Sequence, residues 1–179
     1  MRPMRPDKSI RVQKLRIPTP HGGIPALLLS PVDAPSNATG VLWLHGGGYA
    51  VGMKEMVYAS RAADLVRDFG AVVLSPGYRL SPLAPYPAAL DDCFTALHYL
   101  KQHAASFGVR SDQLMVGGES AGVPAELDVY HSDMHAFDMM RPDDVLSIQA
   151  AEAFNTRFAD AQARFFAPQH EIQEERHDS

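Results

Sequence analysis

The sequence predicts an α/β protein with a mostly parallel sheet flanked by helices. Three short, strongly apolar runs, residues 41–44, 71–75 and 114–117, have the composition of strands buried on both faces. Two segments with helical spacing of apolar residues, 58–69 and 88–107, separate these runs. Strands that alternate with helices form parallel sheets with helices on both faces.

The first part of the chain predicts an antiparallel hairpin. Apolar and polar residues alternate over 9–17, which is the period of a half-buried strand. A turn cluster at 19–23 separates this segment from a second apolar stretch at 24–29. We expect the two strands to pair with each other and to extend the sheet.

Further elements are expected along the chain. The proline-rich segment 80–87 is expected to be a loop, and 126–130 one more strand. A long amphipathic helix is expected over 143–167. Its apolar face would consist of Ala150, Phe154, Phe158, Ala161 and Phe165. The apolar face of the helix at 88–107 would consist of Leu90, Phe94, Leu97 and Leu100.

Length and composition fit one globular domain. The chain has 179 residues, of which 46% are hydrophobic and 21% charged, and a net charge of −5. This charge gives no reason to expect nucleic acid as a partner. Cys93 is the single cysteine, which suits a reducing compartment. No signal peptide and no apolar run of about 20 residues is recognisable, so we expect a cytoplasmic protein without a membrane span.

Two glycine motifs carry the functional prediction. His-Gly-Gly-Gly at 45–48 follows the first buried strand, and Gly-Glu-Ser-Ala-Gly at 118–122 follows the third. The second pattern, after a strand, is that of a nucleophile elbow with the serine at its tip. Glycines let backbone N–H groups approach a substrate oxyanion. A phosphate-binding loop would continue with Lys, Ser or Thr, whereas Tyr49 and Ala50 follow here. A glycine turn with an incidental serine is the alternative.

On these motifs the chain resembles the hormone-sensitive-lipase-like branch of the α/β-hydrolase esterases. Further matching stretches are Tyr-Arg-Leu-Ser-Pro at 78–82, Tyr-Pro-Ala-Ala-Leu-Asp-Asp at 86–92, and residues 123–139, which resemble the last strand of the family and its histidine loop. The resemblance implies an α/β-hydrolase fold. It also implies a serine carboxylic-ester hydrolase that acts on small short-acyl esters through an acyl-enzyme, with no metal or other cofactor.

The resemblance also implies a role for each matching residue. Ser120 would be the nucleophile and His135 the general base. His45 would support the glycine loop without reacting, while Asp91 and Asp92, near a helix start, would have no catalytic role. The oxyanion hole would be formed by backbone N–H groups of Gly46, Gly47, Gly48 and Ala121. A metal bound by His131 and His135 is a weaker alternative, because no third ligand is placed beside them.

The sequence departs from the family pattern after the serine. In the family a long segment with strands, helices and the acidic triad member separates the serine from the histidine. Here that segment is missing, with a seam at 122–123. We therefore expect a truncated α/β-hydrolase domain over 1–167 and a charged, disordered tail over 168–179. No triad acid is found, since the acidic residues near His135 do not match the family's context: Asp128, Asp133 and Asp138.

The shortened connection also restricts the fold. A crossover between parallel strands needs about a dozen residues, and too few lie between 117 and 126. The strand at 126–130 would therefore pair in an antiparallel way, or the region would fail to order. Three alternatives follow: an esterase for a small-molecule ester, a catalytically inactive truncated or spliced relative that acts as a binding module or does not fold stably, and a homo-oligomer joined through exposed sheet edges.

Overall fold

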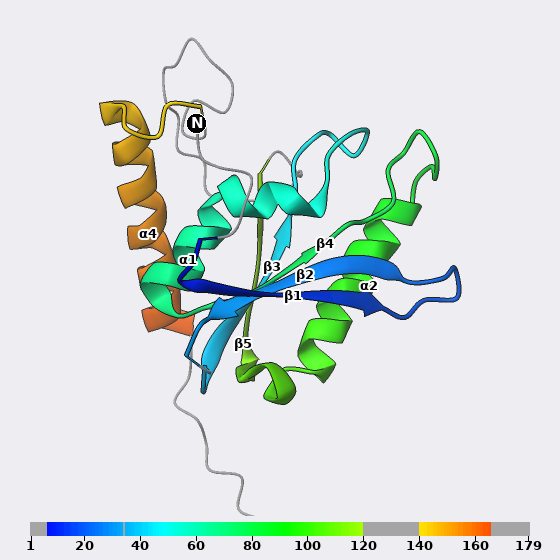
Figure 1. Cartoon of the computed structure of the whole chain (residues 1–179), viewed down its shortest axis with the longest axis horizontal. Helices are drawn as coiled ribbons and strands as arrows, with labels where there is room; N and C mark the ends of the chain where they lie inside the picture. The colour runs from blue at the N-terminus through cyan, green and yellow to red at the C-terminus, as the bar shows by residue number, and fades with distance from the viewer. Residues whose placement is uncertain (1–6, 34, 120–139, 166–179) are drawn as a thin grey trace, which may run out of the picture.

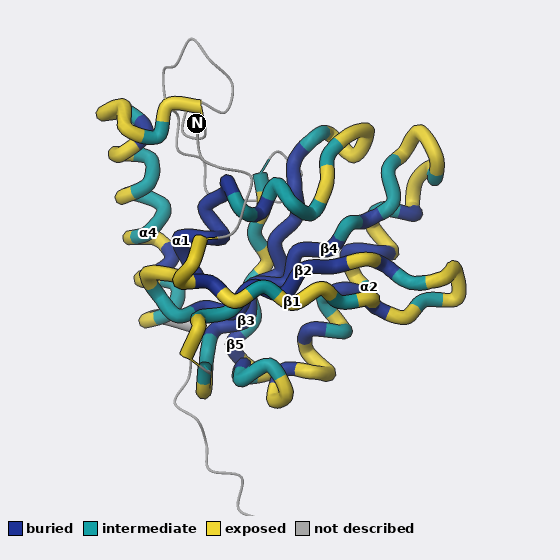
Figure 2. Tube along the Cα trace, in the orientation of Figure 1, coloured by how far each residue is buried: buried dark blue, intermediate teal, exposed yellow. Residues whose placement is uncertain are grey.

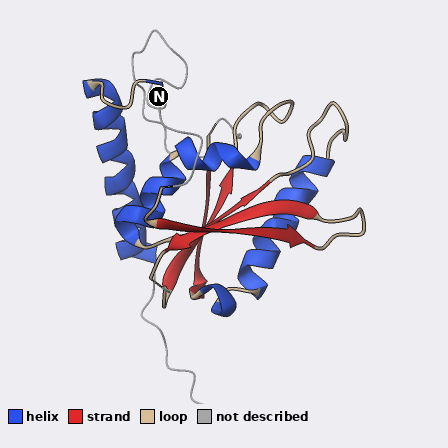
Figure 3. Cartoon of the chain, viewed as in Figure 1, coloured by secondary structure: helices blue, strands red, loops and turns tan. Residues whose placement is uncertain are grey.

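The computed structural model of the chain describes residues 7–33, 35–119 and 140–165. Within this part, the centre of the molecule is a five-stranded sheet with the order β1-β2-β4-β3-β5 (Figures 1 and 3). The strands are β1 (Ile10–Ile17), β2 (Ile24–Pro31), β3 (Ala38–Leu44), β4 (Val72–Pro76) and β5 (Val109–Gly118).

The strand directions confirm a mixed, mostly parallel sheet. β1 and β2 form the expected antiparallel hairpin, in which Ile17 pairs with Ile24. β2 is also antiparallel to β4, whereas β3 runs parallel to both β4 and β5. Only β2 therefore runs against the other described strands, and the carboxyl ends of β3, β4 and β5 lie at one edge of the sheet.

Helices cover both faces of the sheet, as the alternating sequence pattern predicts. The helical elements are η1 (Lys54–Ala59), α1 (Arg61–Phe69), α2 (Ala88–Gln102), η2 (Ala105–Phe107) and α4 (Val145–Phe165). α1 and α4 lie side by side on one face, and α2 lies on the other (Figure 1). Along β3, Leu42 packs toward α2 and Trp43 toward α1. This alternation explains why residues 41–44 of the strand are all apolar.

The helix expected over 58–69 is shorter at its N-terminal end. Ser60 has an extended backbone, and its Oγ accepts a hydrogen bond from the Ala62 N–H at 3.1 Å. Such a cap starts the α-helix at Arg61 and leaves Tyr58 in the preceding 3₁₀ turn. At the other end the helix stops at Gly70, as expected, with φ 66° in the left-handed region.

The apolar face expected for the helix over 88–107 is wrong in part. The α-helix ends at Gln102, and the expected core residues Leu90 and Phe94 are 42% and 55% exposed. The buried face instead holds Ala88, Asp92, Cys93, Ala96 and Leu100. Small side chains let this face approach the sheet closely. The Asp92 carboxylate is paired with Arg79 and can therefore be buried.

The expectation that residues 114–117 are buried on both faces is also wrong. β5 begins earlier, at Val109, and forms the edge of the described sheet. Leu114 and Met115 are half-buried, and Val116 is 42% exposed. As the edge strand of the described sheet, β5 has a described neighbour, β3, on one side only.

The C-terminal helix is confirmed over Val145–Phe165. Phe158 is buried and stacks edge-on against Phe69 of α1, with ring centroids 5.0 Å apart. Phe154 meets Trp43 in the same manner at 6.1 Å. The strand expected at 126–130 and the tail at 168–179 lie outside the described residues. In the described part, every helix is too short or too polar to cross a membrane.

Candidate active site

The sheet topology selects one position for a site. From β3 the chain passes through α1 to β4 on one side, and from β4 it passes through α2 to β5 on the other side of β3. The carboxyl ends of β3 and β5 are therefore a topological switch point, where open α/β sheets bind ligands. Both predicted glycine motifs begin there.

The register between β3 and β5 brings the two motifs to the same level. Leu44, the last residue of β3, pairs with Gly118, the last residue of β5. One residue further, the Glu119 N–H donates to the Leu44 carbonyl oxygen at 3.2 Å. The start of the serine motif thus lies directly beside the start of the His-Gly-Gly-Gly loop. The residues with predicted roles Ser120, Ala121 and His135 lie outside the described residues. So do His131, of the alternative metal site, and the acids that were not assigned to the triad: Asp128, Asp133 and Asp138.

The loop after β3 requires glycine at two positions. Gly47 has φ 116° and Gly52 has φ 117°, and a Cβ at either would overlap a backbone carbonyl, that of Val51 or of Gly46 respectively. The turn is closed by hydrogen bonds from the Ala50 and Val51 N–H groups to the Gly47 carbonyl, at 3.0 and 3.1 Å. These bonds do not use the Gly47 and Gly48 N–H groups, which are predicted oxyanion donors.

His45 lies beneath this loop. Its side chain is 2% exposed, and its ring stacks on Tyr78 with centroids 4.0 Å apart. Nδ1 lies 2.9 Å from the Gly46 carbonyl oxygen, and the Tyr78 hydroxyl donates to the His45 carbonyl at 2.6 Å. Burial lowers the pKa of His45 and raises that of Tyr78. The neutral forms of both side chains are therefore favoured, which suits a supporting role.

A second loop, residues 77–87, is fastened to the first. The Ser81 N–H donates to the Tyr49 carbonyl at 2.8 Å. The loop is fixed to α2 through Arg79, whose backbone N–H donates to Asp92 Oδ2 at 2.9 Å and whose Nη2 donates to Oδ1 at 2.8 Å. Asp92 thus has a structural role in the loop, and Asp91 is exposed in the first turn of α2.

The two loops at this edge of the sheet carry exposed residues, coloured yellow in Figure 2. Several of these residues are apolar. They belong to the tips of the two loops: Tyr49, Val51, Met53, Leu83 and Tyr86. Within the described ranges, His, Cys, Asp and Glu side chains form no group of three that could hold a metal ion.

Sequence reasoning assigned no role to Tyr78 or to Glu119. Tyr78 lies just after β4, at the carboxyl end of a strand parallel to β3. Because ligand sites form at such strand ends, the position of Tyr78 in the sequence could have indicated a role at the site. Glu119 lies within the serine motif, at a position where the pattern accepts any residue. Its contact with α1, described below, depends on tertiary structure and leaves no local signal.

Comparisons with known proteins agree with this geometry. A family model described as the alpha/beta hydrolase fold matches residues 41–124. The chain is 33% identical to esterase LipI of Mycobacterium tuberculosis over 122 residues, which are 67% of this chain and 37% of that protein. It is 38% identical to an ethyl acetate hydrolase of Pseudomonas putida over 93 residues, which are 51% of this chain and 29% of that protein.

Solved structures give the same result. A bacterial heroin esterase superposes with a TM-score of 0.60 at 30% identity, covering 64% of this chain and 37% of that one. A hyperthermophilic esterase from Pyrobaculum calidifontis superposes with a TM-score of 0.57 at 34% identity, covering 63% and 36%. The chain thus spans between 29% and 37% of the length of these relatives. Residues 41–124 thus have the α/β-hydrolase fold, and the chain is similar in sequence and structure to part of several esterases.

Proposed function

We propose that the chain is a serine carboxylic-ester hydrolase for small short-acyl esters. The observation that carries the proposal is the Leu44–Gly118 register, with the Glu119 N–H bonded to the Leu44 carbonyl. It brings the His-Gly-Gly-Gly loop and the residues before Ser120 to one point at the switch of the sheet. A nucleophile and oxyanion donors must meet within one substrate carbonyl of each other, and this register supports such a meeting.

In the proposed reaction, the Ser120 Oγ attacks the ester carbonyl and its proton passes to His135. Backbone N–H groups of Gly47, Gly48 and Ala121, with Gly46, stabilise the oxyanion. The alcohol leaves with the proton from His135, and an acyl-enzyme remains. Water then attacks the acyl-enzyme, again through His135, and releases the acid. His45 supports the loop through its stacking on Tyr78.

The substrate class rests on two observations. Relatives of the chain are named ethyl acetate hydrolase and acetyl esterase, which are names for enzymes of small esters. The loop tips beside the switch point carry exposed apolar side chains such as Val51 and Tyr86, which favour an uncharged ligand. With a single, buried cysteine, the chain suits the cytoplasm.

A second candidate is a catalytically inactive relative that acts as a binding module. The observation in its favour is length, since the chain spans 29% to 37% of the curated relatives it matches. A second observation that favours this candidate is that β5, the edge strand of the described sheet, is half-exposed.

Hydrolysis of p-nitrophenyl esters separates these candidates. An esterase hydrolyses the acetate and butyrate faster than the decanoate, and Ser120→Ala reduces the rate to that of buffer. The matched control is Ser106→Ala, a substitution in the 3₁₀ turn η2, far from the switch point, which retains activity. Equal rates for the wild-type chain and Ser120→Ala would favour the inactive relative.

A further inference from the structure

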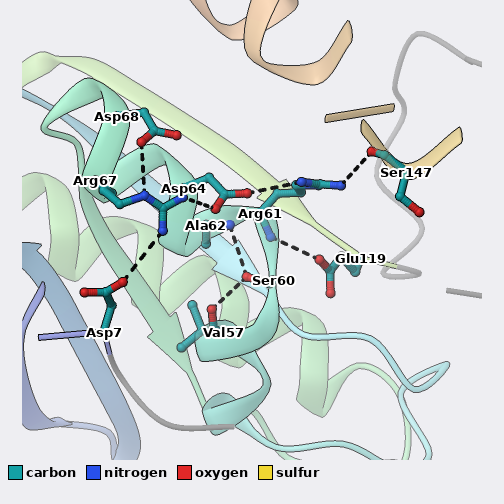
Figure 4. A network of polar contacts seen from close by, with 10 residues as sticks. All are labelled: Asp7, Val57, Ser60, Arg61, Ala62, Asp64, Arg67, Asp68, Glu119 and Ser147. Carbon is teal, nitrogen blue, oxygen red and sulfur yellow. Dashed lines mark hydrogen bonds and ion pairs between the residues drawn. The ribbon is translucent and has the colours of Figure 1, made fainter. Parts of the chain in front are cut away.

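The residue before the proposed nucleophile is held by both its backbone and its side chain. The Glu119 N–H donates to the Leu44 carbonyl at 3.2 Å. Glu119 Oε1 accepts a hydrogen bond from the backbone N–H of Arg61 at 3.4 Å (Figure 4). Arg61 is the first residue of α1. The N–H groups of a first helical turn have no acceptor within the helix, and negative charge is favourable there.

Arg61 continues the connection through its side chain. Its guanidinium is buried, and Nη1 pairs with Asp64 Oδ2 at 3.2 Å. Nη2 donates to the carbonyl of Ser147 in α4 at 3.3 Å. Arg67 also pairs with Asp64, so the buried carboxylate has two cationic partners. In Figure 4 these groups form one continuous set of contacts from Glu119 to α4.

On the basis of the proposed function, we propose that Glu119 is a positioning residue for Ser120, and that Arg61 connects this position to α4. The backbone bond to Leu44 fixes how far β5 extends past its last ladder pair. The carboxylate contact with α1 fixes the rotation of the chain at the point where the serine follows. The carboxylate takes no part in proton transfer.

The physical reason is the strict geometry of nucleophilic attack. A misplacement of about 1 Å can reduce the rate about 10²-fold without removing any reacting group. The predicted N–H donors at 46–48 belong to a loop that its own turn holds, so the serine must be held relative to that turn. Leu44 directly precedes the glycine loop, and Arg61 is the first residue of α1. Glu119 contacts both residues.

The labelling rate with a fluorophosphonate measures this position. The Ser120 Oγ forms a bond to phosphorus, the P–F bond breaks, fluoride leaves, and the serine proton passes to the base. We expect Glu119→Ala to lower the second-order labelling rate by about 10- to 100-fold. Glu119→Gln keeps an oxygen acceptor and recovers most of that rate. Glu152→Ala, which removes an exposed carboxylate from α4, keeps the wild-type rate.

A measurement that does not depend on a reactive serine tests this proposal separately from the proposed function. Amide hydrogen exchange, measured by NMR, should become faster at Glu119 and Arg61 in Glu119→Ala than in Glu152→Ala, with the β1–β2 amides unchanged. If the wild-type chain does not label, the proposed function fails while the exchange rates still decide the positioning role. Equal exchange in the two variants overturns the proposal. So does a wild-type labelling rate in Glu119→Ala, or a Glu119→Gln rate as low as that of Glu119→Ala.

Discussion

The rings of His45 and Tyr78 stack with their planes 6° apart, and the Tyr78 hydroxyl donates to the carbonyl of His45 itself. The two residues follow different strands, β3 and β4. The stack therefore joins the carboxyl ends of these strands directly beneath the glycine loop. It fixes the base of that loop with an uncharged pair of side chains.

Because His45 is buried, we predict that the stability of the fold depends on pH. The pKa of His45 is lowered from the ordinary value of 6.5 by burial. Below pH 6.5 the imidazole of His45 takes up a proton in the unfolded chain but stays neutral in the folded chain. The contribution of His45 to stability is therefore fully present above pH 6.5 and is lost as the pH falls below it. We expect the free energy of unfolding in urea to fall from about pH 7.5 to about pH 5.5, and to fall less in His45→Gln. An equal fall in both proteins would contradict this assignment.

Gly52→Ala should disrupt the oxyanion loop. The new Cβ would overlap the Gly46 carbonyl at φ 117°, so the loop must shift. We expect the fluorophosphonate labelling rate to fall about 10²-fold. Gly70→Ala is the control, since Gly70 also has a positive φ but has open space around its Cβ position. That variant costs about 1–2 kcal/mol of stability and keeps the labelling rate. Similar labelling of the two variants would count against the loop geometry.

Asp92→Asn should loosen the loop at 77–87. Asp92 is 3% exposed and accepts hydrogen bonds from the backbone and side chain of Arg79. Replacing the carboxylate weakens these charge-assisted bonds, and we expect a loss of roughly 2 kcal/mol in urea unfolding. Asp91→Asn, at the exposed neighbouring position, should cost less than about 1 kcal/mol. An equal loss for both substitutions would refute the structural role of Asp92.

Phe158→Ala tests the docking of α4 on α1. Phe158 is 5% exposed and packs on Phe69. Removing a buried phenyl ring leaves a cavity, and we expect a cost of about 3–5 kcal/mol in thermal or urea unfolding. Ile148→Ala changes a 45% exposed residue of the same helix and should cost no more than about 0.5 kcal/mol. A small effect of Phe158→Ala would mean that α4 is not docked as described.

Local patterns predicted the strand and helix order well. A strand covered on one face alternates, as β1 does, and a strand covered on both faces is a continuous apolar run, as in β3 and β4. These strands could therefore be predicted from the sequence. Gly70 and Gly108 end their helical segments because each adopts a left-handed backbone. Each glycine motif directly follows an apolar run, so its place at the end of a strand could also be predicted from the local sequence.

Tertiary contacts account for what the patterns missed. Phe94 has the spacing of a core residue, but the Arg79–Asp92 pair and the small residues Cys93 and Ala96 place another face of α2 on the sheet. Val116 is apolar, yet it lies in the edge strand of the described sheet and is 42% exposed. The contact between Glu119 and Arg61 joins residues far apart in the chain, and no periodicity indicates it.

Mapping of the fluorophosphonate adduct shows whether the two glycine motifs form one esterase site. The folded chain is treated with the probe and digested, and the modified peptide is identified by mass spectrometry. We expect a single adduct on Ser120 that is lost in Ser120→Ala and in urea-unfolded protein. An absence of any adduct on the folded wild-type chain, or an adduct that persists in Ser120→Ala, would contradict this expectation.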